Sequence, residues 1–217
     1  MTESKYKLVI FDLDGTLLDT KEGILASVRY TIDRFGFPMV PEEKLLSFIG
    51  PPIQDSFAQA YDLKGSILQE IATVFRDRYA KKDLYKAKPY EGIYEVFEGL
   101  KKRNVQTAIA TYKREDYARD VLHYFGFDRY TQNIFGGDHE NKLKKKDIIQ
   151  KCVRFASLSS NREALMVGDC LSDGIGAMQN QMDFIAVTYG YGFRWGEDCA
   201  CENVGVCDSP NQLLNLI

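Results

Sequence analysis

The first apolar segment of the chain is short and ends in an acidic residue. Residues 7–12 read KLVIFD, a continuous apolar run that is typical of a buried parallel strand with function at its carboxyl end. Turn-forming residues follow at 14–16. The pattern therefore predicts a central strand that delivers an acid to one edge of a sheet.

From residue 19 to residue 86 the apolar positions follow helical spacing instead. One helical face is marked by Ile24, Val28, Ile32 and Phe35. Further helices are expected at 42–47, 53–60 and 66–81. The inward face of the last one is expected to hold Ile67, Ile71, Val74 and Phe75. This whole section is predicted to be helical.

After residue 92 helices and strands alternate. We expect helices at 92–103, 114–125, 146–157, 173–180 and 211–217. We expect strands at 105–111, 133–136, 164–168 and 183–188. Such alternation predicts an α/β fold with a doubly wound parallel sheet, which the strand at 7–12 must join. The predicted division is a core domain of residues 1–18 and 87–217, with an inserted all-helical domain of residues 19–86.

Composition narrows the class of protein. The chain has 217 residues, 45% hydrophobic and 27% charged, which is ordinary for a globular protein. Its net charge of -3 indicates no general affinity for nucleic acid. No apolar stretch approaches the ~20 residues that span a bilayer, and the first residues do not resemble a secretory signal. We expect a cytoplasmic protein with no membrane partner, as a monomer or a homodimer.

The chain contains five cysteines, an odd count that argues against a disulfide framework. Cys199, Cys201 and Cys207 cluster near the C-terminus. A metal site there would need a fourth ligand, and neither His123 nor His139 is close in sequence. Reduced, partly buried thiols are the favoured interpretation.

Candidate chemistry gathers where the predicted strands end. These positions hold Asp12, Asp14, Thr111, Asp169 and Asp173, with a run of lysines before the helix at 146. In an open parallel sheet, ligands bind outside the carboxyl ends of the strands. Crowded carboxylates repel one another unless a cation lies among them, and oxygen ligands suit Mg²⁺. A lysine and a cation can together neutralise a phosphoryl group, which aspartate can attack as a nucleophile.

The motifs resemble those of the haloacid dehalogenase superfamily in its phosphatase form. The first signature is DLDGTLLDT (12–20), and the others follow in order: Thr111, a lysine before a helix, and GDCLSD (168–173). The similarity is greatest to phosphoglycolate phosphatase-like proteins, with FIGPPIQDSF (48–57) resembling their cap loop. The resemblance covers essentially the whole chain and implies that the helical insertion is a mobile cap.

The resemblance also implies roles for the first matched positions. Asp12 would be the nucleophile and a magnesium ligand. Asp14 would be the general acid and base, with its backbone carbonyl on the metal, and Thr111 would bind phosphate. The usual Thr-Ser-Lys-Pro or Thr-Asn-Lys-Pro is replaced here by TYKR (111–114), which could crowd the site or alter the choice of substrate.

The remaining roles fall on the second half of the chain. Asp169 would bind the metal, and Asp173 would support it through waters or neighbours. Lys145 is our choice for the phosphate-binding lysine, because KKDII resembles the spacing of the family. Lys144 and Lys146 remain alternatives.

These roles predict a Mg²⁺-dependent phosphomonoesterase that acts on a small phosphorylated metabolite, such as phosphoglycolate, a nucleotide or a sugar phosphate. One alternative is a phosphomutase related to β-phosphoglucomutase, which uses the same aspartyl-phosphate. Another is a catalytically silent binding or regulatory protein on the same fold. The Gly50-Pro51-Pro52 segment fits either a plain turn or a loop that reads the leaving group.

Overall fold

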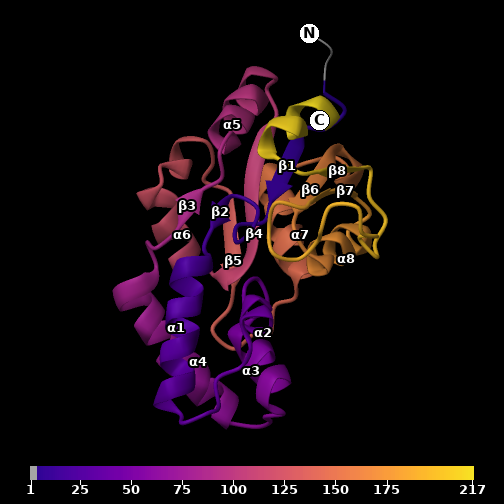
Figure 1. Cartoon of the computed structure of the whole chain (residues 1–217). Helices are drawn as coiled ribbons and strands as arrows, with labels where there is room; N and C mark the ends of the chain where they lie inside the picture. Colours follow the sequence, from indigo (N-terminus) through magenta and orange to yellow (C-terminus); the bar gives the residue numbers. More distant parts are fainter. Residues whose placement is uncertain (1–3) are drawn as a thin grey trace.

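A six-stranded sheet forms the centre of the molecule in the computed structural model, which describes residues 4–217 (Figure 1). The strands run in the order β5-β4-β1-β6-β7-β8, and every neighbouring pair is parallel. Their bounds are β1 Leu8–Phe11, β4 Gln106–Arg114, β5 Ile134–Gly137, β6 Ala164–Gly168, β7 Asp183–Val187 and β8 Gly205–Cys207. β1 therefore lies between β4 and β6, where ligands bind in such sheets.

Helices cover both faces of this sheet. Successive strand residues point to opposite faces, so Val9 and Phe11 enter one apolar core while Leu8 and Ile10 enter another. The first core is completed by α5 (Ile93–Lys102), α6 (Glu115–Tyr124) and α9 (Leu213–Leu216). The second is completed by α7 (Lys145–Ala156) and α8 (Leu171–Gln179). The predicted doubly wound α/β class is confirmed.

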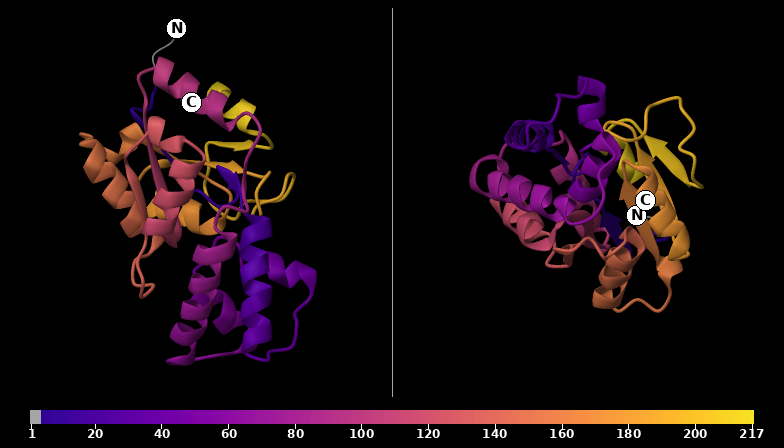
Figure 2. Two further views of the ribbon diagram at one scale, coloured as in Figure 1. Left: turned by 90° about the vertical axis from the view of Figure 1, so that its left-hand side faces the viewer. Right: turned by 90° about the horizontal axis from the view of Figure 1, so that it is seen from below.

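The helical insertion forms a separate lobe below the sheet (Figures 1 and 2). It contains α1 (Lys21–Arg34), α2 (Glu42–Leu46), α3 (Ile53–Tyr61), α4 (Ile67–Arg78) and a π-helix at Tyr79–Asp83. The chain enters and leaves this lobe through the antiparallel pair β2 (Leu18–Asp19) and β3 (Lys88–Pro89). The exact domain boundaries stay a prediction.

Several predicted elements differ in detail. The helix expected at 66–81 ends at Arg78 and continues as the π-helix, and Val74 lines a surface hollow with Tyr30 instead of the core. The strand expected at 105–111 continues to Arg114, with a shift of register after Ala110. β2, β3 and β8 were not predicted, because segments of two or three residues carry no readable periodicity. Short 3-10 turns occur at Phe127–Arg129, Asn161–Glu163 and Pro210–Gln212.

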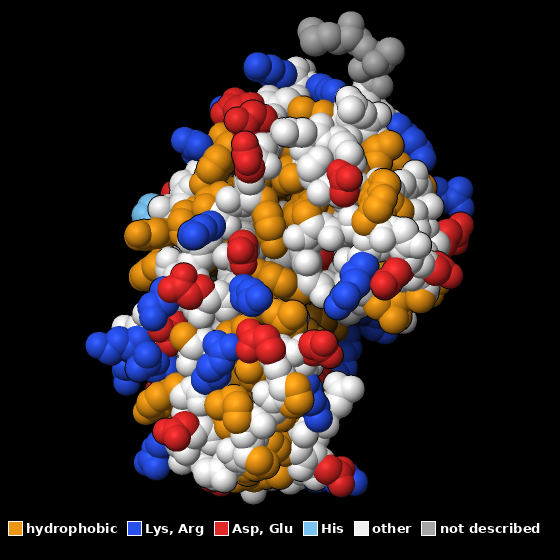
Figure 3. Space-filling view, viewed as in Figure 1, with side chains coloured by type: hydrophobic (Ala, Val, Ile, Leu, Met, Phe, Trp, Pro, Cys, Tyr) orange, Lys and Arg blue, Asp and Glu red, His pale blue; other side chains and the backbone are white. Residues whose placement is uncertain are grey.

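The surface charges and the helix lengths can be compared with the expectation of no nucleic-acid or membrane partner. On the face seen in Figure 3, basic and acidic side chains are interspersed over both lobes. Within residues 4–217, no helix is both long enough and apolar enough to cross a membrane.

Candidate active site

Four buried aspartates meet at the carboxyl ends of β1 and β6. Asp12 directly follows β1, Asp169 directly follows β6, and the two strands are paired. Asp12, Asp14 and Asp169 are only 3–4% exposed, and Asp173 on α8 is fully buried. Parallel pairing thus places acids 157 positions apart in sequence, 12 and 169, at one edge of the sheet.

Lys145 lies among these acids. Its Nζ is 2.6 Å from Asp12 Oδ1 and 2.8 Å from Asp173 Oδ1, and the residue is 3% exposed. Lys144 and Lys146 are both exposed. The structure therefore brings Lys145, and not its neighbours, to the four acids.

The start of α7 explains why Lys145 points inward. Asp147 accepts a hydrogen bond from the Lys144 backbone N–H at 3.0 Å, which closes the first turn of the helix. The Lys145 backbone N–H donates to the Tyr112 hydroxyl at 3.0 Å. Tyr112 departs from the usual family pattern, and here it positions the residue that carries the buried cation.

Asp169 is held by the chain around it. Its Oδ2 accepts hydrogen bonds from the backbone N–H groups of Tyr191 (2.7 Å) and Gly192 (3.3 Å). Gly15 has φ +86°, and a Cβ there would lie 2.2 Å from Asp169 Oδ2. Only glycine permits this approach, because it has no side chain. The loop of the first motif can therefore pack directly against Asp169.

The oxygens that remain free suit a magnesium ion. Among residues 4–217, no donor meets Asp12 Oδ2 or Asp169 Oδ1. Burial, together with the charges of Asp173 and Asp14, raises the pKa of Asp12 to about 7, although the charge of Lys145 acts in the opposite direction. Burial and the charges of Asp12 and Asp173 also raise the pKa of Asp169 well above its usual value. A divalent cation would relieve this repulsion, and the donors are the hard oxygens that Mg²⁺ prefers.

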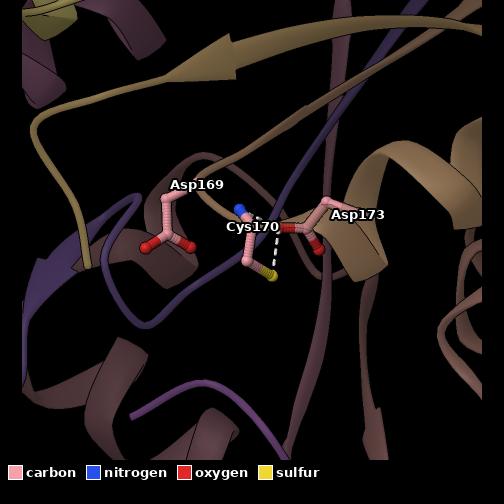
Figure 4. Close-up of side chains that lie close together, drawn as sticks. All are labelled: Asp169, Cys170 and Asp173. Carbon is pink, nitrogen blue, oxygen red and sulfur yellow. Dashed lines mark hydrogen bonds between the residues drawn. The ribbon is translucent and has the colours of Figure 1, made fainter. Parts of the chain in front are cut away.

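Cys170 lies between Asp169 and Asp173 (Figure 4). Burial raises the pKa of its thiol well above the usual value, and its Sγ donates to Asp173 Oδ2 at 3.1 Å. A protonated thiol is a poor ligand for a hard cation. We therefore assign Cys170 to holding Asp173 in place rather than to binding metal.

Asp14 has a cationic partner that the sequence did not indicate. Lys113 Nζ lies 3.0 Å from Asp14 Oδ1 and donates to the Tyr79 hydroxyl at 2.9 Å. Tyr79 belongs to the π-helix at the end of the helical lobe. The second acid of the motif is thereby connected to the insertion through one lysine.

Thr111 is less directly engaged. It is 1% exposed, and its hydroxyl accepts a hydrogen bond from the Lys113 backbone N–H at 3.1 Å. It lies within β4, three residues before the strand ends. Among the described residues, no hydrogen bond joins it to the four aspartates.

A cavity of about 80 Å³ separates the helical lobe from the sheet edge. Asp14 and Lys113 line it from the core, and the Gly50-Pro51-Pro52 loop lines it from the insertion. Phe48, Phe75 and Tyr117 are among its aromatic walls. The loop and Asp14 thus line the same cavity from opposite lobes, and a role of the loop in reading the leaving group stays a prediction.

Comparison with known proteins identifies the family. The profile of the haloacid dehalogenase-like hydrolases matches residues 9–187. A 5'-nucleotidase from Pseudomonas aeruginosa is 33% identical over 189 residues, which are 87% of this chain and 85% of the relative. A phosphoglycolate phosphatase from Vibrio parahaemolyticus is 27% identical over 226 residues, covering 100% of this chain and 98% of the relative.

Solved structures agree with these matches. The crystal structure of a predicted phosphatase from Clostridium acetobutylicum superimposes with a TM-score of 0.91 at 31% identity, covering 98% of each chain. The chain belongs to the haloacid dehalogenase-like hydrolase family. The predicted family and the predicted enzyme class, a phosphatase of this type, are confirmed.

Sequence reasoning missed three residues of this region. They are Lys113, Arg76 and Tyr191. Lys113 occupies the lysine position of the usual Thr-Ser-Lys-Pro motif, and that match was the available signal. Arg76 lies in an amphipathic helix, where a charged residue is normally expected on the face exposed to solvent. Tyr191 stood in an aromatic run, but its hydroxyl donates to Asp19 Oδ1 at 2.5 Å.

Proposed function

We propose that this phosphatase is a Mg²⁺-dependent phosphomonoesterase that hydrolyses a small phosphorylated metabolite through phosphorylation of Asp12. The observation that carries the proposal is the Asp12 carboxylate, which is paired with Lys145 on one oxygen and receives no donor from residues 4–217 on the other. A nucleophilic carboxylate needs one oxygen free to attack. The names of relatives, a 5'-nucleotidase and a phosphoglycolate phosphatase, support a small substrate.

The reaction divides into two displacements at phosphorus. An Asp12 oxygen bonds to phosphorus while the ester P–O bond breaks, and Asp14, which must be protonated for this step, gives its proton to the leaving oxygen. Asp14 then takes a proton from a water molecule, whose oxygen attacks phosphorus and releases inorganic phosphate from Asp12. Lys145 and Thr111 would hold the phosphoryl oxygens during both steps.

The magnesium site follows from the same residues. Asp12, Asp169 and the backbone carbonyl of Asp14 would hold the ion, and Asp173 would act on it through waters or through Lys145. When bound, the ion supplies positive charge that offsets the charge of the phosphoryl oxygens. Without such charge, an anionic nucleophile and an anionic substrate repel each other.

The test is hydrolysis of an aryl phosphate with and without Mg²⁺. We expect turnover that depends on the metal, and we expect Asp12→Asn to lower kcat by at least about 1,000-fold, since nucleophile loss removes the covalent route. Asp33→Asn, at an exposed position on α1, is the matched control and should retain wild-type activity.

Each alternative has its own signature in this experiment. Absence of metal-dependent turnover on any phosphate ester would favour a silent binding protein. Full activity of Asp12→Asn would exclude the proposed nucleophile while leaving the enzyme class in place. With a sugar phosphate as substrate, an isomerised product instead of free phosphate would indicate a phosphomutase.

A further inference from the structure

The cavity above Asp14 contains a cation that is not required for phosphoryl transfer. We propose that Arg76 binds a second anionic group on the leaving-group side of the substrate, so that the enzyme prefers small phosphate esters with an additional negative charge. This inference rests on the proposed phosphatase function. It concerns the choice of substrate and not the reacting atoms.

Arg76 has no carboxylate partner of its own. It comes from α4, lines the cavity and is 8% exposed. Its Nη1 donates to the His139 carbonyl at 2.8 Å, and its Nη2 donates to Gln54 Oε1 at 3.3 Å. Both acceptors are neutral, and none of the ion pairs formed within residues 4–217 involves Arg76. A buried cation without a counter-charge is costly, which indicates that an anion completes the site.

The guanidinium also retains unused donors. An arginine side chain carries five N–H groups and stays charged in proteins, and the described contacts use at most three of them, the third being a longer contact from Nη1 to His139 Nδ1 at 3.5 Å. Burial lowers the pKa of Arg76, and repulsion from Arg114 lowers it further. An anion beside Arg76 would remove that strain and accept the remaining hydrogen bonds, in the two-pronged manner that suits carboxylate and phosphate.

The other two cations that line the cavity are each paired with a carboxylate. Lys113 is paired with Asp14, and Arg114 is paired with Asp116. Asp138 lies near Arg76 but beyond ion-pair distance, and its carboxylate accepts backbone N–H groups from residues 140, 142 and 143. Among the described residues, Arg76 is therefore the one cation lining the cavity that has no carboxylate within ion-pair distance.

The size of the cavity limits the rest of the substrate. Its volume of about 80 Å³ is well below the ~300–1,000 Å³ of pockets for drug-sized ligands. A leaving group of a few heavy atoms fits this conformation, such as a short hydroxy acid or a phosphate. The chemistry shared by these groups is an anion close to the scissile bond, and the experiment distinguishes them.

The experiment compares three substrates that differ in the leaving group. These are 2-hydroxyethyl phosphate (neutral), phosphoglycolate (carboxylate) and inorganic pyrophosphate (phosphate). We expect wild-type kcat/KM to favour one anionic leaving group over the neutral one. In Arg76→Gln that preference should fall about 10- to 100-fold, the range for hydrogen bonds to a charged partner. Whichever anionic substrate loses its advantage identifies the anion.

Two further variants make the result specific. Arg29→Gln removes an arginine of the same lobe that pairs with Glu42 outside the cavity, and its substrate preference should equal that of wild type. Arg76→Lys keeps the charge without the planar fork and should retain part of the preference. Because the readout is a ratio of kcat/KM values within one preparation, a smaller folded fraction does not change it.

The outcomes separate the two proposals. Equal loss on all three substrates in both Arg76 variants would show that the residue only holds the cap against the His139 carbonyl, and would overturn the inference. A wild-type enzyme without preference for an anionic leaving group would overturn it as well. If none of these three substrates and no aryl phosphate is hydrolysed with Mg²⁺, the proposed function itself fails.

Discussion

Removal of the Lys113 charge should destabilise the protein strongly, because it leaves Asp14 buried without its partner. The two side chains are each only 6% exposed and their charged atoms are 3.0 Å apart. At an effective dielectric constant of about 20, Coulomb's law assigns about 5 kcal/mol to two unit charges at this distance. Measured losses on breaking one side of a buried pair are about 3–5 kcal/mol.

Lys113→Met tests this reasoning because methionine keeps the apolar length of the side chain. We expect its free energy of unfolding in urea to fall by about 3–5 kcal/mol. Lys146→Met is the matched control, since Lys146 is exposed on α7, and it should change the free energy by less than about 0.5 kcal/mol.

A double-mutant cycle separates the pair from the rest of the site. In Asp14→Asn the lysine is left with the Tyr79 hydroxyl alone, and in the double variant neither charge is present. The loss in the double variant should be smaller than the sum of the two single losses by more than about 1 kcal/mol. Additivity within about 0.5 kcal/mol would refute the argument, because it would show that the two charges do not interact in solution.

Three further substitutions probe different parts of the structure. Lys145→Met should lower kcat on an aryl phosphate at least about 100-fold, as expected for loss of a charge that stabilises the transition state, while Lys144→Met should not. Asp83 is fully buried, and although burial opposes ionisation, hydrogen bonds from Lys86, Arg78 and Ser27 hold its pKa below the usual value. Its stabilising effect is therefore fully present above about pH 4 and is lost as the pH falls through the lower pKa of the folded state. Urea unfolding of wild type and Asp83→Asn should thus differ by about 1–3 kcal/mol at pH 7 and by progressively less as the pH falls below about 4. Gly15→Ala should abolish most activity because the new Cβ would meet a carboxylate oxygen of the metal site at 2.2 Å, whereas Gly36→Ala, with φ +66° and nothing within 4 Å, should cost stability alone.

The sheet could be predicted because each strand carries its own local signal. β1 and β6 are continuous apolar runs, as strands buried on both faces must be. β8 could not be predicted in the same way, since three residues at the edge of the sheet show no period. The prediction for the inward face of α4 was partly wrong. It assigned Val74 to the core, whereas the structure buries Ala72 and Arg76 instead. An amphipathic pattern predicts an apolar stripe along a helix. The neighbouring elements decide which residues at the borders of that stripe are buried.

The residues of the candidate site likewise differ in whether a local signal in the sequence could place them. Asp12 and Asp169 could be placed together from the sequence, because parallel strands end at one edge and an acid follows each of them. The choice among three neighbouring lysines needed the start of α7, which orients Lys145 alone toward the acids. Arg76 could not be foreseen, since its place above the site depends on how the inserted helices dock against the core. Docking of this kind is non-local packing, and no spacing within α4 reports it.

This division gives the two lobes separate tasks. The acids and Lys145 belong to the core, where paired strands and a glycine contact fix their positions. Arg76 and the Gly50-Pro51-Pro52 loop belong to the insertion, which meets the core across the cavity. Tyr191 connects the two, because its backbone N–H binds Asp169 while its hydroxyl binds Asp19 in β2, where the chain enters the insertion. That one residue therefore joins Asp169, an acid of the proposed metal site, to the segment where the chain enters the helical lobe.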